Sequence, residues 1–154
     1  MRSIFDLLGE QPLFADLPEP DRGLIAGCGH NVHVAAGEPI VRHGAPADHF
    51  YLLRSGRAQL EIHQPGRGAL VAETLQTGSI VGVSWLFPPY RYTFDAVAVG
   101  PCDLIAIDAA CLRTKCDTDT RLGYLLMRRF AAVLVDRIEH LQIRLLDVYA
   151  HDLG

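Results

Sequence analysis

The sequence predicts a mainly β fold with flanking helices: two short N-terminal helices, a β-roll, and one long C-terminal helix. Short runs of β-forming residues, separated by glycines, fill residues 31–108. Helical spacing of apolar residues appears before and after this region, and residues 120–148 contain no proline and no glycine other than Gly123. Many short strands with glycine turns are typical of a sandwich, a barrel or a roll.

The N-terminal segment is predicted to form two short helices, over residues 3–9 and about 18–27. Pro18 suits a first helical turn, where its missing N–H is not needed. Gly27 then ends the second helix, because glycine is the residue that most often follows a helix.

The central segment is predicted to contain the strands of the roll. Alternation from Ala58 to Ile62 places one face inward and one outward, and Pro65–Gly68 forms a hairpin loop. Seven β-rich runs are predicted as strands: Val32–Ala35, Pro39–Arg42, Phe50–Leu53, Ala58–His63, Ala69–Leu75, Phe94–Val99 and Leu104–Ile107.

After Asp108 the pattern is helical again. Ala109–Lys115 predicts a short helix, and Asp117–Asp119 a turn that can cap the long helix that follows, at about residues 120–148. We therefore expect a single domain over residues 1–154: helices in 1–30, the roll in 31–108 and helices in 109–148.

The long helix carries apolar residues spaced alternately four and three apart, the heptad pattern by which two helices bury a shared stripe. This seam predicts a homodimer; the alternative is a helix that folds back onto its own domain. A second stripe, Leu126, Phe130 and Val133, lies on another face of the first half only. The seam consists of Met127, Ala131, Leu134, Ile138, Leu141, Leu145 and Val148.

Composition excludes several classes of protein. The chain of 154 residues is 49% hydrophobic and 21% charged, with a net charge of −4, which is ordinary for one globular domain. This net negative charge argues against sequence-independent binding of nucleic acid. No apolar run is long enough to span a membrane, and Asp6 and Glu10 interrupt what would be a signal peptide. We expect a cytoplasmic protein without a membrane partner.

The cysteines and histidines suggest neither a metal site nor an active site. Cys28, Cys102, Cys111 and Cys116 are irregularly spaced, and in a cytoplasmic protein we expect them to be reduced, buried thiols. The seven histidines form no H-x-H pair, and neither a nucleophile elbow nor paired acids are present. The chain is not expected to be an enzyme.

The segment Gly37–Gly56 contains a glycine-led strand, a G-x-x-x-D turn and an aromatic-x-Leu-x-x-Gly strand. This resembles the start of the cyclic-nucleotide-binding domain of Crp/Fnr-type regulators. Gly78–Gly82 resembles the strand that enters that family's phosphate-binding cassette, and Leu145–Val148 its junction with a helix-turn-helix domain. The resemblance covers about residues 12–148. It implies a jelly roll (double-stranded β-helix), here as a stand-alone form without the helix-turn-helix, and hence no direct DNA binding.

The cassette departs from the family pattern. In the family a Gly-Glu pair precedes a short helix, and an Arg-Ser or Arg-Thr pair follows it; the Glu binds the ribose and the Arg binds the cyclic phosphate. Here Val83 follows Gly82, and Tyr92 and Thr93 stand where the second pair is expected. Arg91 is one residue away, and a loop shifted by Pro88-Pro89 would return it to the phosphate. Asp95 is its candidate internal partner.

The resemblance therefore implies an atypical ligand site. On the long helix, the family's contacts with the purine base fall near Asp136 and Arg137; the alternative is that these two polar residues form a plain solvated turn of the helix. The alternative is a pocket filled by core side chains, with Trp85, Phe87, Tyr90 and Tyr92 as candidates. The expected ligand-binding residues are Gly82, Val83, Ser84, Trp85, Arg91, Tyr92, Thr93, Asp136 and Arg137.

These expectations combine into two functional hypotheses. The first is a ligand-sensing regulatory module that binds cyclic AMP, another cyclic nucleotide or a related small anion, and signals through the dimerising helix to a protein partner. The second is a constitutive protein-interaction module with a degenerate, non-binding pocket. No other cofactor is implied.

Overall fold

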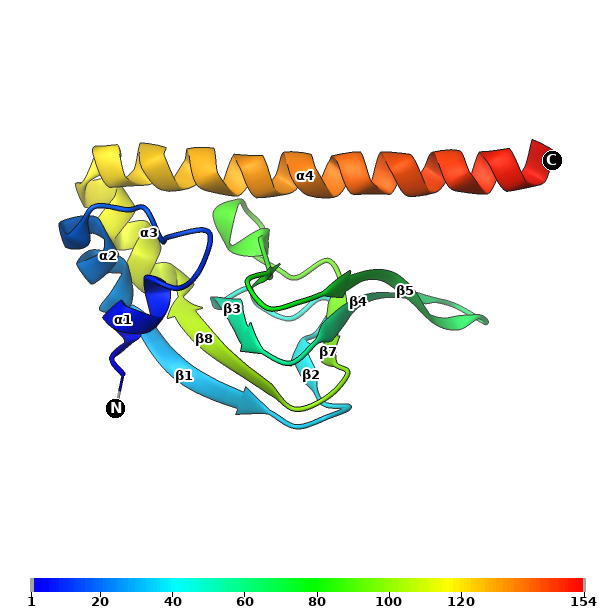
Figure 1. Cartoon of the computed structure of the whole chain (residues 1–154), viewed down its shortest axis with the longest axis horizontal. Coiled ribbons are helices and arrows are strands. Elements are labelled where there is room, and N and C mark those ends of the chain that lie inside the picture. The colour runs from blue at the N-terminus through cyan, green and yellow to red at the C-terminus, as the bar shows by residue number, and fades with distance from the viewer. Residues whose placement is uncertain (1, 154) are drawn as a thin grey trace. The chain divides into compact units, whose positions relative to one another are not determined.

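The structure, a computed structural model, describes residues 2–153, with side chains described through His151. The chain divides into two compact units, Met1–Lys115 and Cys116–Gly154. The first unit contains the sheets, and the second consists mainly of one long helix (Figure 1). That the whole chain acts as one domain stays a prediction.

The first unit is a mainly β structure with flanking helices, as the sequence predicts. Its strands form two four-stranded sheets of antiparallel pairs, with the orders β1-β8-β3-β6 and β2-β7-β4-β5. Its elements are α1 (Ile4–Leu8), α2 (Glu19–Ala26), β1 (Gly29–Val34), β2 (Pro39–Val41), β3 (His49–Ser55), β4 (Ala58–Gln64), β5 (Gly68–Leu75), β6 (Ile80–Val81), the 3-10 helix η1 (Ser84–Leu86), β7 (Asp95–Ala98), β8 (Cys102–Asp108) and the start of α3 (Ala109–Thr118).

The sequence-predicted strands are all present, with ends that shift by a few residues. The largest difference is at β1, which begins at Gly29 rather than Val32; β8 begins at Cys102 rather than Leu104, and β3 ends at Ser55 rather than Leu53. Backbone pairing sets these ends: Gly29 lies opposite Ile107, and Cys102 lies opposite Val34. Such pairing between distant segments cannot be detected from local composition.

The sheet that contains β8 is buried on both faces. Leu104 and Ile105, which point to opposite faces because they are neighbours in a strand, are both fully buried. The helix α1 packs closely against the start of β1, because a Cβ added at Gly29 would lie 2.9 Å from the Ile4 side chain and 3.0 Å from the Ile107 side chain. In Figure 1, α1 lies beside β1 and β8. The N-terminal helices therefore cover one face of this sheet, while its other face points into the interior of the roll.

The helix α3 is longer than predicted. It begins at Ala109 and continues to Thr118, so the predicted turn at Asp117–Asp119 shrinks to Asp119 alone. Asp119 still caps the next helix, because its carboxylate accepts from the backbone N–H of Leu122 at 3.1 Å.

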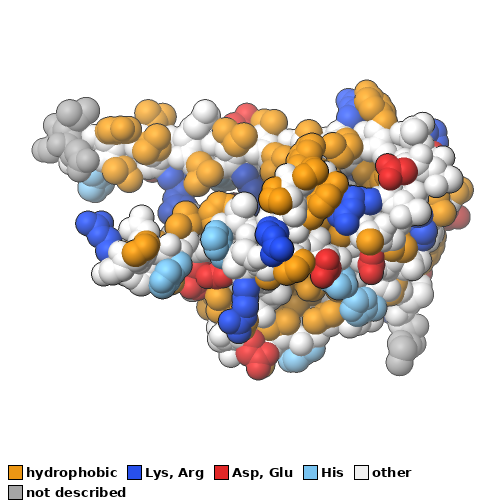
Figure 2. Space-filling model, turned by 180° about the vertical axis from the view of Figure 1, so that it is seen from behind, with side chains coloured by type: hydrophobic (Ala, Val, Ile, Leu, Met, Phe, Trp, Pro, Cys, Tyr) orange, Lys and Arg blue, Asp and Glu red, His pale blue; other side chains and the backbone are white. Residues whose placement is uncertain are grey.

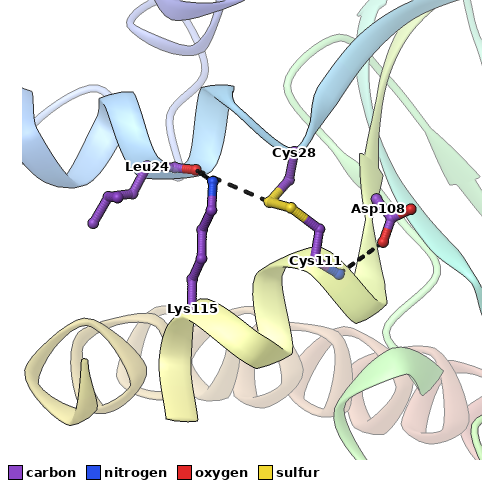
Figure 3. Close-up of a disulfide and its surroundings, with 5 residues drawn as sticks. All are labelled: Leu24, Cys28, Asp108, Cys111 and Lys115. Atoms are coloured by element: carbon purple, nitrogen blue, oxygen red, sulfur yellow. Dashed lines mark hydrogen bonds between the residues drawn. A yellow bond between two sulfur atoms is a disulfide. The ribbon is translucent and has the colours of Figure 1, made fainter. Parts of the chain in front are cut away.

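The expectation of four reduced cysteines is wrong for two of them. Cys28 and Cys111 form a disulfide, with Cα atoms 5.8 Å apart, a normal separation for such a bond. Figure 3 shows the bond between the start of β1 and the first turn of α3. The residues are 83 positions apart in sequence and meet only because β1 and β8 pair. Cys102 and Cys116 are free.

The second unit contains α4 (Thr120–Leu153), a helix of 34 residues that extends five residues beyond the predicted end at Val148. Leu126 and Phe130, from the predicted second stripe, are buried, as is Leu122. The seam is largely exposed, with Ile138 53% and Leu141 51% accessible. Figure 2 shows hydrophobic side chains exposed along the C-terminal part of α4. Within residues 2–153, no helix is long and apolar enough to cross a membrane.

Gly56 provides a test of the tight turn between β3 and β4. Its φ is +91°, and an added Cβ would overlap the Pro101 carbonyl oxygen and lie 3.0 Å from Cys102 Sγ. We expect Gly56→Ala to lower the free energy of unfolding by about 3 kcal/mol, because backbone strain and overpacking add. Urea denaturation followed by circular dichroism measures this change.

Gly66→Ala is the matched control. Gly66 also has a positive φ, +79°, but no atom lies within 4 Å of the position that an added Cβ would take. Its substitution should cost only about 1 kcal/mol, the strain alone. Equal effects of the two substitutions would contradict the close contact at Gly56.

Candidate functional site

The predicted ligand residues of the roll lie in the segment that joins β6 to β7, residues 82–94. This segment is fastened to the turn before β3 by three backbone hydrogen bonds. The Ala47 N–H donates to Tyr90 O at 2.7 Å, the Tyr92 N–H donates to Ala45 O at 3.0 Å, and the Gly44 N–H donates to Tyr92 O at 2.8 Å. These bonds fix the backbone around Arg91 and Tyr92, and therefore the direction of both side chains.

Tyr92 is buried beside Gly82. Only 7% of it is exposed, and a Cβ at Gly82 would lie 3.0 Å from Tyr92 Cε1. The Tyr92 hydroxyl donates to His49 O at 2.5 Å. Burial, followed by the neighbouring Tyr51, raises the pKa of Tyr92 to about 12. The position expected to hold the family's phosphate-binding arginine is thus occupied by a neutral phenol.

Arg91 points the other way. Its side chain is exposed, and Nη1 donates to Gly44 O at 2.8 Å. The expected partner Asp95 instead accepts from the His43 N–H at 2.7 Å. The structure therefore bonds Arg91 to the turn before β3 rather than to Asp95. The Pro88-Pro89 peptide bond is cis, and a contact between Arg91 and a ligand phosphate stays a prediction.

Trp85 and Tyr90 are held by an arginine that the sequence did not reveal. Trp85 is buried and stacks on Phe50, with ring centroids 4.9 Å apart. Arg113 Nη1 donates to Trp85 O at 2.8 Å, and the Arg113 guanidinium lies 4.3 Å from the centre of the Tyr90 ring. The cation–π contact and the hydrogen bond tie η1 and its loop to α3.

The remaining predicted residues differ in their surroundings. Val83 and Ser84 are half-buried, and Thr93 is exposed. Phe87, a candidate core residue, is 58% exposed, so that expectation is wrong. Asp136 and Arg137 lie on α4, where Asp136 contacts His140 through Oδ2 at 3.6 Å. Their contact with a ligand stays a prediction.

Two residues near Tyr92 were not among the predicted site residues. His49 supplies the carbonyl oxygen that binds the Tyr92 hydroxyl, and its ring lies 5.8 Å from that of His30. Tyr51 lies two residues along β3, and its own pKa is raised by burial and by the charge of Asp48. In the described part of the chain, no group of three or more His, Cys, Asp or Glu residues is placed to hold a metal ion.

Tyr92 predicts a loss of stability at high pH. Its ordinary pKa is 10.0 and its folded pKa is about 12. The stability that its neutral form contributes is thus fully present below pH 10 and is lost between about pH 10 and 12. We expect Tyr92→Phe to reduce this alkaline loss, measured by urea denaturation across that range. Tyr124→Phe, at a 65% exposed position, is the control. A pH dependence unchanged by Tyr92→Phe would contradict the burial of the phenol.

Several solved structures share this fold. A protein of Geobacter metallireducens GS-15 named as a cyclic nucleotide-binding protein is 29% identical, with a TM-score of 0.78, and the match covers 90% of this chain and 99% of that one. A cyclic nucleotide-binding domain from Methylobacillus flagellatus KT is 18% identical, with a TM-score of 0.79 and coverages of 94% and 81%. The Thermus thermophilus catabolite activator protein is 24% identical, with a TM-score of 0.71, and the match covers 91% of this chain and 63% of that one.

No curated protein sequence matches the chain closely enough to count as a relative. The family model described as "Cyclic nucleotide-binding domain" matches residues 31–119. The match begins within β1 and includes β2 to β8, η1, α3 and the segment that holds Tyr92. This chain belongs to the cyclic nucleotide-binding domain family.

Proposed function

We propose that this chain is a regulatory module in which Tyr92 closes the phosphate position of the roll, and which acts on a protein partner as an α4-mediated homodimer. The observation that carries the proposal is the buried Tyr92 phenol beside Gly82, bonded to His49 O. This is the second of the two sequence-based hypotheses. The function is regulatory and involves no reaction.

The energetics of the lost contacts support the proposal that the roll does not bind cyclic nucleotides. A ligand phosphate at this position would lack the arginine, and its ribose would lack the glutamate that Val83 replaces. Each lost charge-assisted hydrogen bond costs about 1.5–3 kcal/mol, which weakens binding about tenfold to a hundredfold or more. The ligand would also have to displace Tyr92, breaking its hydrogen bond with His49 O.

Titration calorimetry with cyclic AMP and cyclic GMP tests the proposal. We expect no measurable binding by the wild-type chain. Restoring the family pattern with Val83→Glu and Tyr92→Arg together should create binding of cyclic AMP, because both charged contacts return.

Arg91→Ala distinguishes this proposal from the ligand-sensing hypothesis. Because Arg91 is exposed and bonded to Gly44 O, the substitution should not affect binding by the restored variant. Binding of cyclic AMP by the wild-type chain that is lost in Arg91→Ala would contradict the proposal and favour a ligand-sensing pocket built around Arg91.

The second part of the proposal concerns α4. Ile138, Leu141, Leu145 and Val148 are each more than half exposed, although a stripe of large apolar side chains in water is unfavourable. The heptad spacing makes this stripe complementary to a second copy of itself. The expected occupant is therefore the α4 helix of another protomer.

Leu141→Glu tests the dimer. Leu141 lies in the seam, whereas Ile143 occupies an outer position of the same heptad and is 59% exposed. We expect Leu141→Glu to yield a monomer, because two like charges would face each other across the interface, and Ile143→Glu to remain dimeric. Light scattering after size-exclusion chromatography gives the mass. A wild-type monomer, or equal behaviour of both variants, would contradict the seam.

A cytoplasmic location belongs to the same proposal. Disulfides in the cytoplasm are uncommon, and those that occur there are usually catalytic or redox-sensing. The Cys28–Cys111 bond therefore requires an explanation of its own.

A further inference from the structure

The first turns of α3 are joined to the rest of the first unit on two sides. On one side, Arg113 contacts Trp85 and Tyr90 in the loop after β6. On the other side, Cys111 is bonded to Cys28, and Lys115 Nζ donates to Leu24 O at 2.7 Å. The disulfide is the only covalent part of this attachment among the described residues. The helix α3 therefore links the loop that carries the predicted ligand residues to α2.

The surroundings of the disulfide favour its reduced form. Cys111 lies in the first turn of α3, where the positive end of the helix dipole stabilises a thiolate. Figure 3 shows Lys115 beside the bond. Its ammonium group and Cys28 Sγ both contact Leu24 O, at 2.7 and 4.0 Å. A neighbouring cation also stabilises a thiolate. Asp108, which accepts from the Cys111 N–H at 2.8 Å, is the opposing charge.

One of the two sulfur-bearing residues is accessible. Cys28 is only 6% exposed, whereas Cys111 is half-buried. An attacking thiolate must reach a sulfur in line with the bond that breaks, so access decides which sulfur is attacked. Attack at Cys111 leaves Cys28 as the leaving thiolate, and Leu24 O is already in place to accept a hydrogen bond from the Cys28 thiol that forms.

We propose that Cys28–Cys111 is a redox modification site, opened by a dithiol reductant, that controls the attachment of α3 to α2. The first reductant thiolate attacks Cys111 Sγ, forming a mixed disulfide and releasing Cys28, which takes up a proton. The second reductant thiolate attacks the mixed disulfide and releases Cys111, which takes up the other proton. The chain gains two electrons and two protons, and the dithiol becomes a disulfide.

Reduction leaves part of the attachment in place. The Asp108 N–H still donates to Cys28 O at 2.8 Å, and the Ala109 N–H to Asp48 O at 2.8 Å. Ala109 and Leu112 also remain buried residues of the core. On the α2 side, the Lys115–Leu24 hydrogen bond also remains. Only Asp119 separates α3 from α4. A larger range of motion in α3 therefore also changes the motion of the first residues of α4.

The experiment measures two quantities on the folded, full-length chain. Oxidised protein is treated with dithiothreitol without denaturant, its thiols are trapped with a maleimide, and peptides are identified by mass spectrometry. Amide hydrogen exchange is then compared between the two states. We expect Cys28 and Cys111 to be reduced while the circular dichroism spectrum is unchanged. Exchange over residues 110–115 should rise about tenfold, with β3 and β8 unaffected.

Three further measurements sharpen the test. Treatment with oxidised glutathione should place the mixed disulfide on Cys111 rather than Cys28. Lys115→Met should lower the equilibrium constant for reduction by about threefold, and Lys115→Arg should restore it. Cys116→Ser, which removes a free thiol, should change nothing.

Some outcomes would overturn the proposal. Reduction that requires denaturant would show a purely structural bond. Unchanged exchange over residues 110–115, in reduced wild-type protein and in Cys28→Ser/Cys111→Ser, would show that the bond does not hold α3. None of these measurements depends on ligand binding or dimerisation, so the proposal stands or fails independently of the proposed function.

Discussion

The contact between Tyr92 and Gly82 is the interaction on which the proposed function depends. The phenol occupies the space that the missing Cβ of Gly82 leaves free, and its hydroxyl binds His49 O at 2.5 Å. This one side chain therefore joins the end of β6, the start of β3 and the segment that leads into β7. Backbone hydrogen bonds with Gly44 and Ala45 hold Tyr92 in register. The same bonds direct Arg91 outward, so the position beside Gly82 holds a neutral group.

The loop after β6 is connected to the rest of the chain through α3. Arg113 binds the Trp85 carbonyl and lies over the Tyr90 ring, while Lys115, two residues further along the same helix, donates to Leu24 O. In a domain that senses a ligand, such a connection would carry a change in the loop to the helices. In the proposed function Tyr92 closes the phosphate position, and the proposed redox site at the disulfide would then act on the same helix from its other side.

The sequence predicted the elements well and the contacts between them poorly. The strands and α4 have strong local sequence patterns: apolar and polar residues alternate in β4, and α4 has a heptad repeat. Such patterns can be recognised without knowing the tertiary contacts. The disulfide could not be predicted, because Cys28 and Cys111 meet only through the pairing of β1 with β8. The partners of Tyr92 and Trp85, His49 and Arg113, lie far away in sequence. Counting back from Ala98 predicts Tyr92 at the family's arginine position, and only the structure shows that this side chain is buried while Arg91 is exposed.

The central claim is that Tyr92, rather than a ligand phosphate, occupies the position beside Gly82. A crystal structure of the chain grown with an excess of cyclic AMP tests it most directly. The account predicts an unchanged Tyr92 hydroxyl on His49 O and no nucleotide in the roll. Density for a nucleotide with its phosphate near Gly82 and Arg91, and with Tyr92 displaced, would contradict it.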